Sequence, residues 1–167
     1  MEVQTIDSFL TYYEKTRETT LRIIEVVPHD KMDWTYKPGK FTIGDLIRHI
    51  GAIERNLFAE LVIGNPSLYT GSGKELATDY NQIVAYLNEM HQQSMQRFQA
   101  LTDADLTKTI SAIGGTQATV GGFLRALIIH EVHHRGALCI YLNMLGVTTP
   151  PVLGMTEEQV RSFSNPI

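Results

Sequence analysis

Hydrophobic residues recur every three or four positions in four long stretches of the chain, the spacing typical of amphipathic helices. The first predicted helix covers residues 6–27 and ends at Pro28. Its apolar face holds Ile6, Phe9, Leu10, Tyr13, Ile24 and Val27. In the loop that follows, three aromatic residues are expected to cover one end of the packed helices: Trp34, Tyr36 and Phe41.

The second predicted helix begins after Phe41. Thr42 is suited to cap its N-terminus, and Asp45, three residues later, completes an approximate capping box. The helix is closed by the turn-forming run Gly64-Asn65-Pro66. Its apolar positions are Ile43, Leu46, Ile47, Ile50, Ile53, Leu57 and Leu61.

A third helix is predicted for residues 79–101, with one face formed by Tyr80, Val84, Leu87, His91, Met95 and Phe98. Residues 109–119 form a loop that has room for a short hairpin. The fourth helix covers residues 120–145, with Thr119 as its N-cap and Gly146 as its C-terminal stop. A short helix is expected in the tail near residues 156–160.

These four helices, with no convincing run of strands, predict an all-α protein built as a four-helix bundle. The connection between the second and third helices, residues 65–78, is long enough to be a crossover. The second and third helices therefore need not be antiparallel neighbours. We expect residues 1–150 to form the bundle and residues 151–167 to form a C-terminal tail.

Composition narrows the class of protein. The chain has 167 residues, which suits one domain, and 43% of them are hydrophobic, enough to build a core. Fourteen Lys+Arg against eighteen Asp+Glu give a net charge of −4, so the basic excess typical of nucleic-acid-binding proteins is missing. The single cysteine, Cys139, excludes an internal disulfide framework and fits a reducing compartment.

The sequence also argues against a membrane location. Its first residues lack the basic head and apolar core of a signal peptide. The longest uncharged stretch, residues 136–156, is interrupted by Asn143, Gly146 and Pro150-Pro151, so it does not predict a transmembrane helix. We therefore expect a cytoplasmic protein that acts on a small-molecule substrate, without a nucleic-acid or membrane partner.

Three histidines fall within five residues of the fourth predicted helix: His130, His133 and His134. Because a helix turns about 100° per residue, His130 and His134 lie about 40° apart on one face. Both interrupt an apolar stripe that is expected to face the core, where an unpartnered imidazole costs free energy. A metal ion bound by both rings supplies the missing partner, whereas His133 points elsewhere.

His49 lies at the edge of the apolar stripe of the second helix and is the candidate third ligand. Three histidine ligands leave a zinc-like ion with open positions, as in catalytic rather than structural sites. Asp45, one turn earlier, has two candidate roles, orienting His49 or capping the helix, and capping is favoured. We interpret His91 as a core histidine with satisfied hydrogen bonds, and His29 as a surface or capping residue.

The same stretch matches the zinc-protease pattern H-E-x-x-H, with Glu131 as the would-be general base. The metzincin extension fails because Gly136 comes one position too early and no third histidine follows. The protease hypothesis is therefore the weaker one. Glu131 is instead expected to pair with Arg135 one turn later, and Gly136 to mark the close approach of another helix.

Two segments resemble the signature helices of the DinB-like/YfiT-like superfamily: PGKFTIGDLIRHIGAIE and LRALIIHEVHHRGALCIYLNMLG. The resemblance covers about residues 5–147 and implies a four-helix bundle with a long crossover, and frequent homodimers. It also implies a divalent metal on His49, His130 and His134, with zinc or nickel expected and iron or manganese as alternatives. Ala137 stands where many members carry glutamine.

The resemblance further implies a reaction class. Characterised members use low-molecular-weight thiols, as bacillithiol transferases or thiol-dependent isomerases, and others are described as hydrolases. We therefore expect a thiol-dependent S-transferase in which a metal-bound thiolate meets an electrophile. Two alternatives stay open, a metal-dependent hydrolase and a non-catalytic metal-binding stress-response protein. In the second alternative a fourth ligand such as His91 or Glu131 would close the coordination shell.

Overall fold

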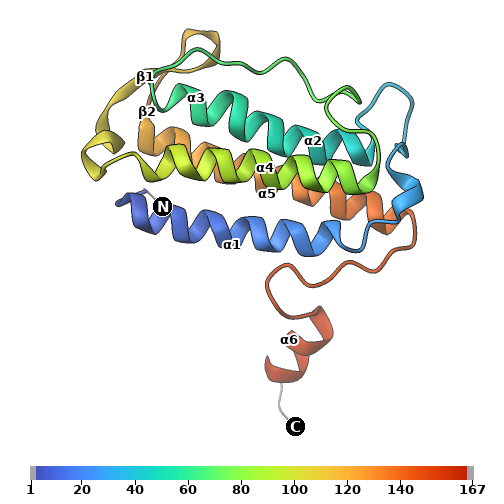
Figure 1. Ribbon diagram of the computed structural model, residues 1–167. Coiled ribbons are helices and arrows are strands. Elements are labelled where there is room, and N and C mark those ends of the chain that lie inside the picture. Colours follow the sequence, from blue (N-terminus) through green and yellow to red (C-terminus); the bar gives the residue numbers. More distant parts are fainter. Residues whose placement is uncertain (1–2, 165–167) are drawn as a thin grey trace.

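Four long helices pack side by side in the computed structural model, which describes residues 3–164 (Figure 1). They are α1 (Ile6–Ile24), α2 (Ile43–Ile53), α4 (Tyr80–Gln99) and α5 (Val120–Met144). A π-helical turn (Glu54–Phe58) and the short α3 (Ala59–Leu61) continue the line of α2. The predicted all-α four-helix bundle is confirmed, although α1 ends three residues earlier than expected and the π-helical turn was not foreseen.

Each long helix begins at a polar cap whose side chain accepts a backbone N–H. Thr42 and Asp45 form the predicted capping box, with bonds of 3.0 and 2.9 Å in the two directions. Thr119 accepts the N–H of Gly122, as predicted for the start of α5. Thr5 and Asp79 cap α1 and α4 in the same way.

The order of the helices around the bundle follows from their contacts. Residue numbers rise together along the contacts between α2 and α4. Gly51 packs on Leu87, and Arg55, just beyond the end of α2, donates to Gln93. These neighbours are therefore parallel, and residues 65–78 cross the length of the bundle to connect them (Figure 1). The predicted crossover is confirmed. Helices α1 and α5 are likewise parallel, whereas α2 runs antiparallel to α5 and α1 antiparallel to α4.

The remaining elements are short. Residues 3–164 contain three 3-10 turns, His29–Lys31, Asp103–Thr107 and Ile113–Gly115. Strands β1 (Thr109–Ser111) and β2 (Gln117–Thr119) pair antiparallel, so the loop before α5 does contain the short hairpin. The tail carries α6 (Glu157–Ser164), every residue of which is exposed, and Figure 1 shows it away from the four long helices.

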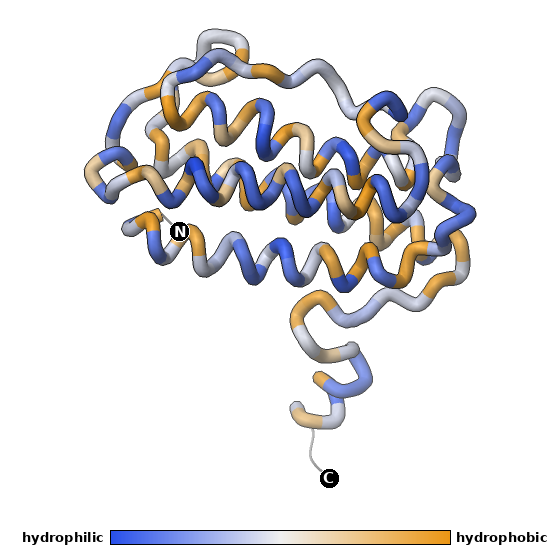
Figure 2. Tube along the Cα trace, viewed as in Figure 1, coloured by the Kyte–Doolittle hydropathy of each residue, from blue (hydrophilic) through white to orange (hydrophobic). Residues whose placement is uncertain are grey.

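Hydrophobic and hydrophilic residues alternate in short runs along the bundle helices (Figure 2), and the buried apolar ones form two core clusters. One cluster surrounds Phe9 and Phe98, and the other surrounds Ile47 and Leu138. Between them, every long helix contributes a buried or half-buried polar side chain, namely Arg17, His49, Glu54, His91, His130, Glu131 and His134. A polar layer thus lies across the middle of the bundle.

Two further expectations are settled by the structure. Gly136 is exposed, and in the described chain no atom of a neighbouring residue comes within 4 Å of the place its Cβ would take. The predicted close approach of another helix is therefore wrong within one copy of the chain. Among residues 3–164, no helix is long and apolar enough to cross a membrane.

Candidate metal centre

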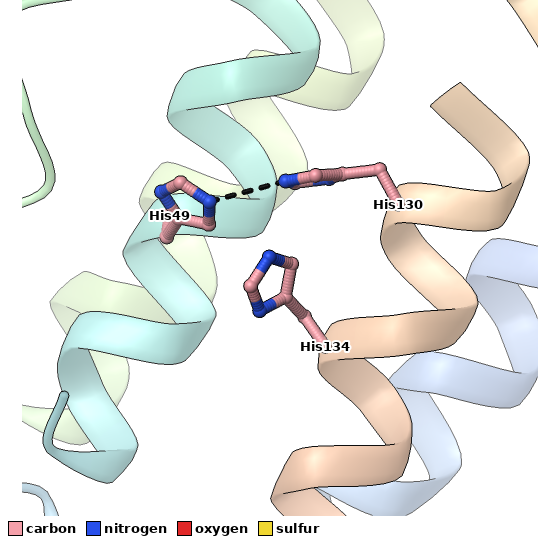
Figure 3. Close-up of side chains that lie close together, drawn as sticks. All are labelled: His49, His130 and His134. Carbon is pink, nitrogen blue, oxygen red and sulfur yellow. Dashed lines mark hydrogen bonds between the residues drawn. The ribbon is translucent and has the colours of Figure 1, made fainter. Parts of the chain in front are cut away.

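Three histidines converge from two helices at the middle of the bundle. His49 comes from α2, and His130 and His134 project toward it from successive turns of α5 (Figure 3). One nitrogen from each ring lies within 4.8 Å of the other two, and the Nε2 atoms of His49 and His130 are 3.1 Å apart. The structure therefore brings together the three residues that helix geometry selected in the sequence.

Antiparallel packing explains why the rings meet. His130 and His134 are four residues apart and so present their rings on one face of α5, with ring centres 4.4 Å apart. The ring of His49 lies 5.0 Å from that of His130 and 4.6 Å from that of His134. His133 is exposed, its ring centre lies 4.9 Å from that of His134, and it is not part of the group.

All three histidines are neutral at neutral pH. Burial and the nearby imidazoles of His134, His49 and His133 lower the pKa of His130 from 6.5 to about 3. Burial and the neighbouring His49 and His133 lower the pKa of His134 to about 4. Burial also lowers the pKa of His49. Metal coordination requires unprotonated ring nitrogens, and this environment favours them without any cost of deprotonation at pH 7.

The orientation of His49 is fixed by a residue that the sequence analysis missed. The Nδ1 atom of His49 lies 2.9 Å from the hydroxyl of Tyr69, on the crossover. In the tautomer with its proton on Nδ1, His49 donates to Tyr69 and keeps Nε2 free for an ion. The crossover is held in place by Leu68, whose N–H donates to the carbonyl of Asn56 at 2.7 Å. No local sequence signal predicts a contact that depends on how the crossover is laid over α2.

Asp45 caps the N-terminus of α2, which was the favoured of its two candidate roles. Besides its part in the capping box, its carboxylate accepts a hydrogen bond from Arg48 at 2.6 Å. Both interactions hold Asp45 at the start of α2, so the hydrogen-bond partner of His49 is Tyr69 rather than Asp45.

The residues present fit a divalent ion of the zinc type. Each neutral imidazole has one protonated nitrogen and one nitrogen with a free lone pair. The three rings can therefore each offer a lone pair to one ion. Within residues 3–164 the Nδ1 atom of His130 is buried without a hydrogen-bond partner. Its Nε2 atom faces that of His49 at 3.1 Å, a separation at which two lone pairs repel unless a proton or a cation lies between them, so a shared ion would stabilise this arrangement.

Glu131 faces α1 rather than α2, and it lies outside the group of potential ligands. It is fully buried, and its carboxylate accepts hydrogen bonds from Arg17 of α1 at 2.8 Å and from Thr20 at 2.7 Å. Arg17 also donates to Glu54 at 2.6 Å. The expected pairing of Glu131 with Arg135 is therefore wrong, because α1 supplies a buried arginine that the pattern of α5 alone does not reveal.

Arg135 is also placed differently from the prediction. It is buried, and it donates to the backbone carbonyl of Thr16 at 3.1 Å instead of pairing with Glu131. Glu131, the glutamate of the H-E-x-x-H match, cannot act as a general base at the histidine group, because its carboxylate lies between α5 and α1. The protease alternative is not supported by the structure.

His91 is a satisfied core histidine, as expected. Its Nδ1 atom lies 2.8 Å from Glu54, its Nε2 atom lies 3.3 Å from Glu14, and its ring packs against the edge of Tyr13. His29 is exposed and stacks on Tyr80. Over the described residues, the group of potential ligands contains no fourth histidine, cysteine or carboxylate. Three protein ligands would leave an ion with open positions.

An open groove of about 340 Å³ adjoins the histidine group at His134. It is lined mainly by aromatic and small apolar side chains, together with Lys40 and His133. Its members are Tyr36, Gly39, Lys40, Phe41, Leu46, His133, His134, Ala137 and Tyr141. A small molecule therefore has a route to the open side of the centre.

The fold and the site together define a class of small helical proteins. Its members are four-helix bundles with parallel α2 and α4, a long crossover and three convergent histidines that could hold a metal ion. The chain belongs to the DinB superfamily, whose family model matches residues 12–138. A curated relative is the uncharacterised protein YrdA of Bacillus subtilis, 28% identical over 96% of this chain and 95% of its own length.

Solved structures share the fold. A DinB-like protein from Bacillus cereus superposes with a TM-score of 0.77 at 23% identity, over 89% of this chain and 97% of its own. YfiT from Bacillus subtilis superposes with a TM-score of 0.69 at 16% identity, over 86% of this chain and 89% of its own. YfiT is described as a probable metal-dependent hydrolase with an unusual four-helix bundle topology. At these identities the likeness establishes the fold alone.

Proposed function

We propose that His49, His130 and His134 hold one divalent metal ion and that the protein is a metal-dependent enzyme acting on a small molecule. The convergence of three neutral ring nitrogens within 4.8 Å, beside an open groove, carries this proposal. Imidazole ligands suit zinc and nickel, with iron and manganese as further candidates. The open coordination positions favour catalysis over a purely structural role.

A low-molecular-weight thiol is the co-substrate that the site favours. When bound, the ion lowers the pKa of a coordinated thiol, so that the thiolate forms near neutral pH. No carboxylate lines the described groove to act as a general base, and a thiol that ionises in this way needs none. Cys139 is not the source of the thiol, because it is half-buried in the core and burial raises its pKa. We therefore propose an S-transferase that takes its thiol from solution.

Metal-dependent hydrolysis is the second candidate, and the likeness to YfiT favours it. It would use the same three histidines, with water in place of the thiol. Water bound to such an ion ionises near pH 7, as a bound thiol does, so both reactions can run without a carboxylate among the groove-lining residues.

Product analysis separates the two reactions. Zinc- and nickel-loaded protein is incubated with several low-molecular-weight thiols and a panel of electrophiles, and separately with ester and amide substrates. We expect thioether products that form with wild type and are absent with His134→Ala. Hydrolysis products without thiol consumption would replace the transferase by the hydrolase. No product of either kind from metal-loaded protein would contradict the enzyme proposal.

We also propose that the protein is a cytoplasmic homodimer that pairs through the outer face of α5. Between Ala126 and Met144 the exposed residues of α5 include no lysine, arginine, aspartate or glutamate, and the polar ones are His133 and Asn143. Apolar residues flank the exposed Gly136 at nearly symmetric spacings: Ile129, Val132, Ile140 and Met144. Such a stripe complements itself when a second copy crosses it antiparallel at the glycine, as a twofold interface requires.

A further inference from the structure

One wall of the groove beside the histidines is formed by the loop that precedes α2, and this wall is in place without a ligand. Its loop turns at Lys37-Pro38-Gly39-Lys40, where the N–H of Lys40 donates to the carbonyl of Lys37 at 3.2 Å. Gly39 has a φ of 78°, so proline and glycine occupy the two central positions that a type II turn prefers. This turn places Lys40 among the residues that line the groove.

The rest of the loop is anchored to the bundle on both sides. The N–H of Ile43 donates to the carbonyl of Trp34 at 3.0 Å, and the hydroxyl of Tyr141 donates to the carbonyl of Phe41 at 3.1 Å. The rings of Trp34 and Tyr36 pack edge-on against Tyr141. Of the three aromatic residues that the sequence placed over one end of the helices, Tyr36 and Phe41 line the groove, and Trp34 packs against Tyr141.

Aromatic rings face the groove from two elements. Tyr36 and Phe41 come from the loop, and Tyr141 comes from α5. Phe41 also lies 5.2 Å from the ring of His49, so the aromatic wall reaches the histidine group. Flat apolar molecules pack well against such surfaces because ring faces and edges complement each other.

The charge of the groove is opposite to the charge of the whole chain. The chain carries a net charge of −4, yet the groove is lined by Lys40 and by no aspartate or glutamate among the described residues. Lys37 lies in the same turn. A local positive potential attracts anions to the groove, whereas the negative charge on the rest of the surface repels them.

We propose that this groove binds small aromatic anions, with the aromatic body against Tyr36, Phe41 and Tyr141 and the anionic group paired with Lys40. The proposal deepens the proposed function, because the groove opens at His134 and its occupant would be the molecule that meets the thiol. The substrate class is thus an aromatic electrophile that carries a carboxylate or a similar anionic group.

Calorimetric titration with a matched pair of ligands tests this inference. The probes are 2-naphthoate and its uncharged amide, 2-naphthamide, added to metal-free and to zinc-loaded protein. Lys40→Gln removes the charge from the groove, and Lys15→Gln removes an exposed lysine on α1 as a matched control. Ala137→Phe fills the groove without changing charge. Circular dichroism verifies that each variant is folded.

We expect 2-naphthoate to bind more tightly than 2-naphthamide to both forms of the protein. Lys40→Gln should weaken 2-naphthoate binding by about fivefold, the size expected of an exposed ion pair, and leave the amide unchanged. Lys15→Gln should change neither, and Ala137→Phe should weaken both. Equal binding of acid and amide, or equal effects of Lys40→Gln and Lys15→Gln, would overturn the inference.

The metal-free arm separates this inference from the proposed function. If the protein binds no metal but 2-naphthoate still binds with a dependence on Lys40, the groove assignment stands and the metal proposal fails. If 2-naphthoate binds zinc-loaded protein alone and does not respond to Lys40→Gln, the anion is held by the ion, and the groove assignment is wrong.

Discussion

At the scale of single residues, the polar side chains of α5 within the bundle divide into two groups that face different neighbouring helices. His130 and His134 face α2 and His49, whereas Glu131 faces Arg17 of α1. One residue of displacement along a helix turns a side chain by about 100°, which is enough to separate them. The histidines therefore lie beside an open groove, while the carboxylate is confined to a buried ion pair.

Tyr69 is expected to set the metal affinity through His49. Tyr69→Phe removes the hydroxyl that lies 2.9 Å from Nδ1 and leaves the ring in place. Loss of such an outer partner typically costs about 10-fold in metal affinity. Zinc competition against a chromophoric chelator measures the effect, and Tyr12→Phe, at an exposed position on α1, is the control. Equal zinc affinity in the two variants would contradict this role.

His91 is expected to make stability depend on pH. Burial alone would lower its pKa, but the hydrogen bond and negative charge of Glu54, with a further bond to Glu14, raise the pKa above 6.5. The folded protein then holds the proton more tightly than the unfolded chain does. This contribution is present in full below about pH 6.5 and is lost as pH rises through the raised pKa.

The free energy of unfolding, measured with urea from pH 5.5 to 8.5, checks the sign. Wild type should lose more stability over this range than His91→Gln, which keeps a hydrogen-bonding side chain but does not titrate. An identical pH dependence of the two proteins would rule out the contribution of His91.

At the scale of elements, the sequence predicts each long helix because its signals are local. Capping at Thr42 and Thr119 depends on neighbours three residues away, and the apolar spacing depends on neighbours within two turns. The ligand set follows from the same spacing on α2 and α5. The π-helical turn at Glu54–Phe58 and the contact of Tyr69 with His49 depend on packing between distant segments. No local pattern encodes them.

The tail is expected to contribute little to the stability of the bundle. All residues of α6 are exposed, whereas Val152, just before it, still packs against the core. A chain that ends at Met155 should therefore keep its thermal midpoint within about 2 °C of the full chain, because exposed residues rarely change stability. Differential scanning calorimetry of the two chains measures this. A clearly lower midpoint for the shortened chain would show that residues after Met155 cover part of the bundle.

At the scale of the whole molecule, the bundle consists of two apolar clusters separated by a polar layer. Buried polar groups are costly unless paired, and the layer holds ion pairs between α5 and α1 and converging imidazoles between α5 and α2. The imidazoles keep an orphaned nitrogen within the described chain. The ring nitrogens that face one another in this layer are the place where we propose that an ion binds.

The outer face of α5 should govern the oligomeric state. Ile140→Glu places a charge in the exposed apolar stripe and should convert a dimer to a monomer, because a twofold axis brings two copies of the new charge together. Ile113→Glu changes an equally exposed isoleucine in the hairpin turn and serves as the control. Light scattering after size exclusion gives the masses. A wild-type monomer, or an Ile140→Glu dimer, would contradict the proposed interface.

Metal content measures the central claim most directly. Elemental analysis is made on wild type, His49→Ala, His134→Ala and the control His133→Ala, each reloaded with zinc or nickel and freed of excess. The three-histidine centre predicts about one equivalent of metal in wild type and in His133→Ala, and its loss from His49→Ala and His134→Ala. Wild type without metal after reloading, or metal retained in both His49→Ala and His134→Ala, would contradict the account.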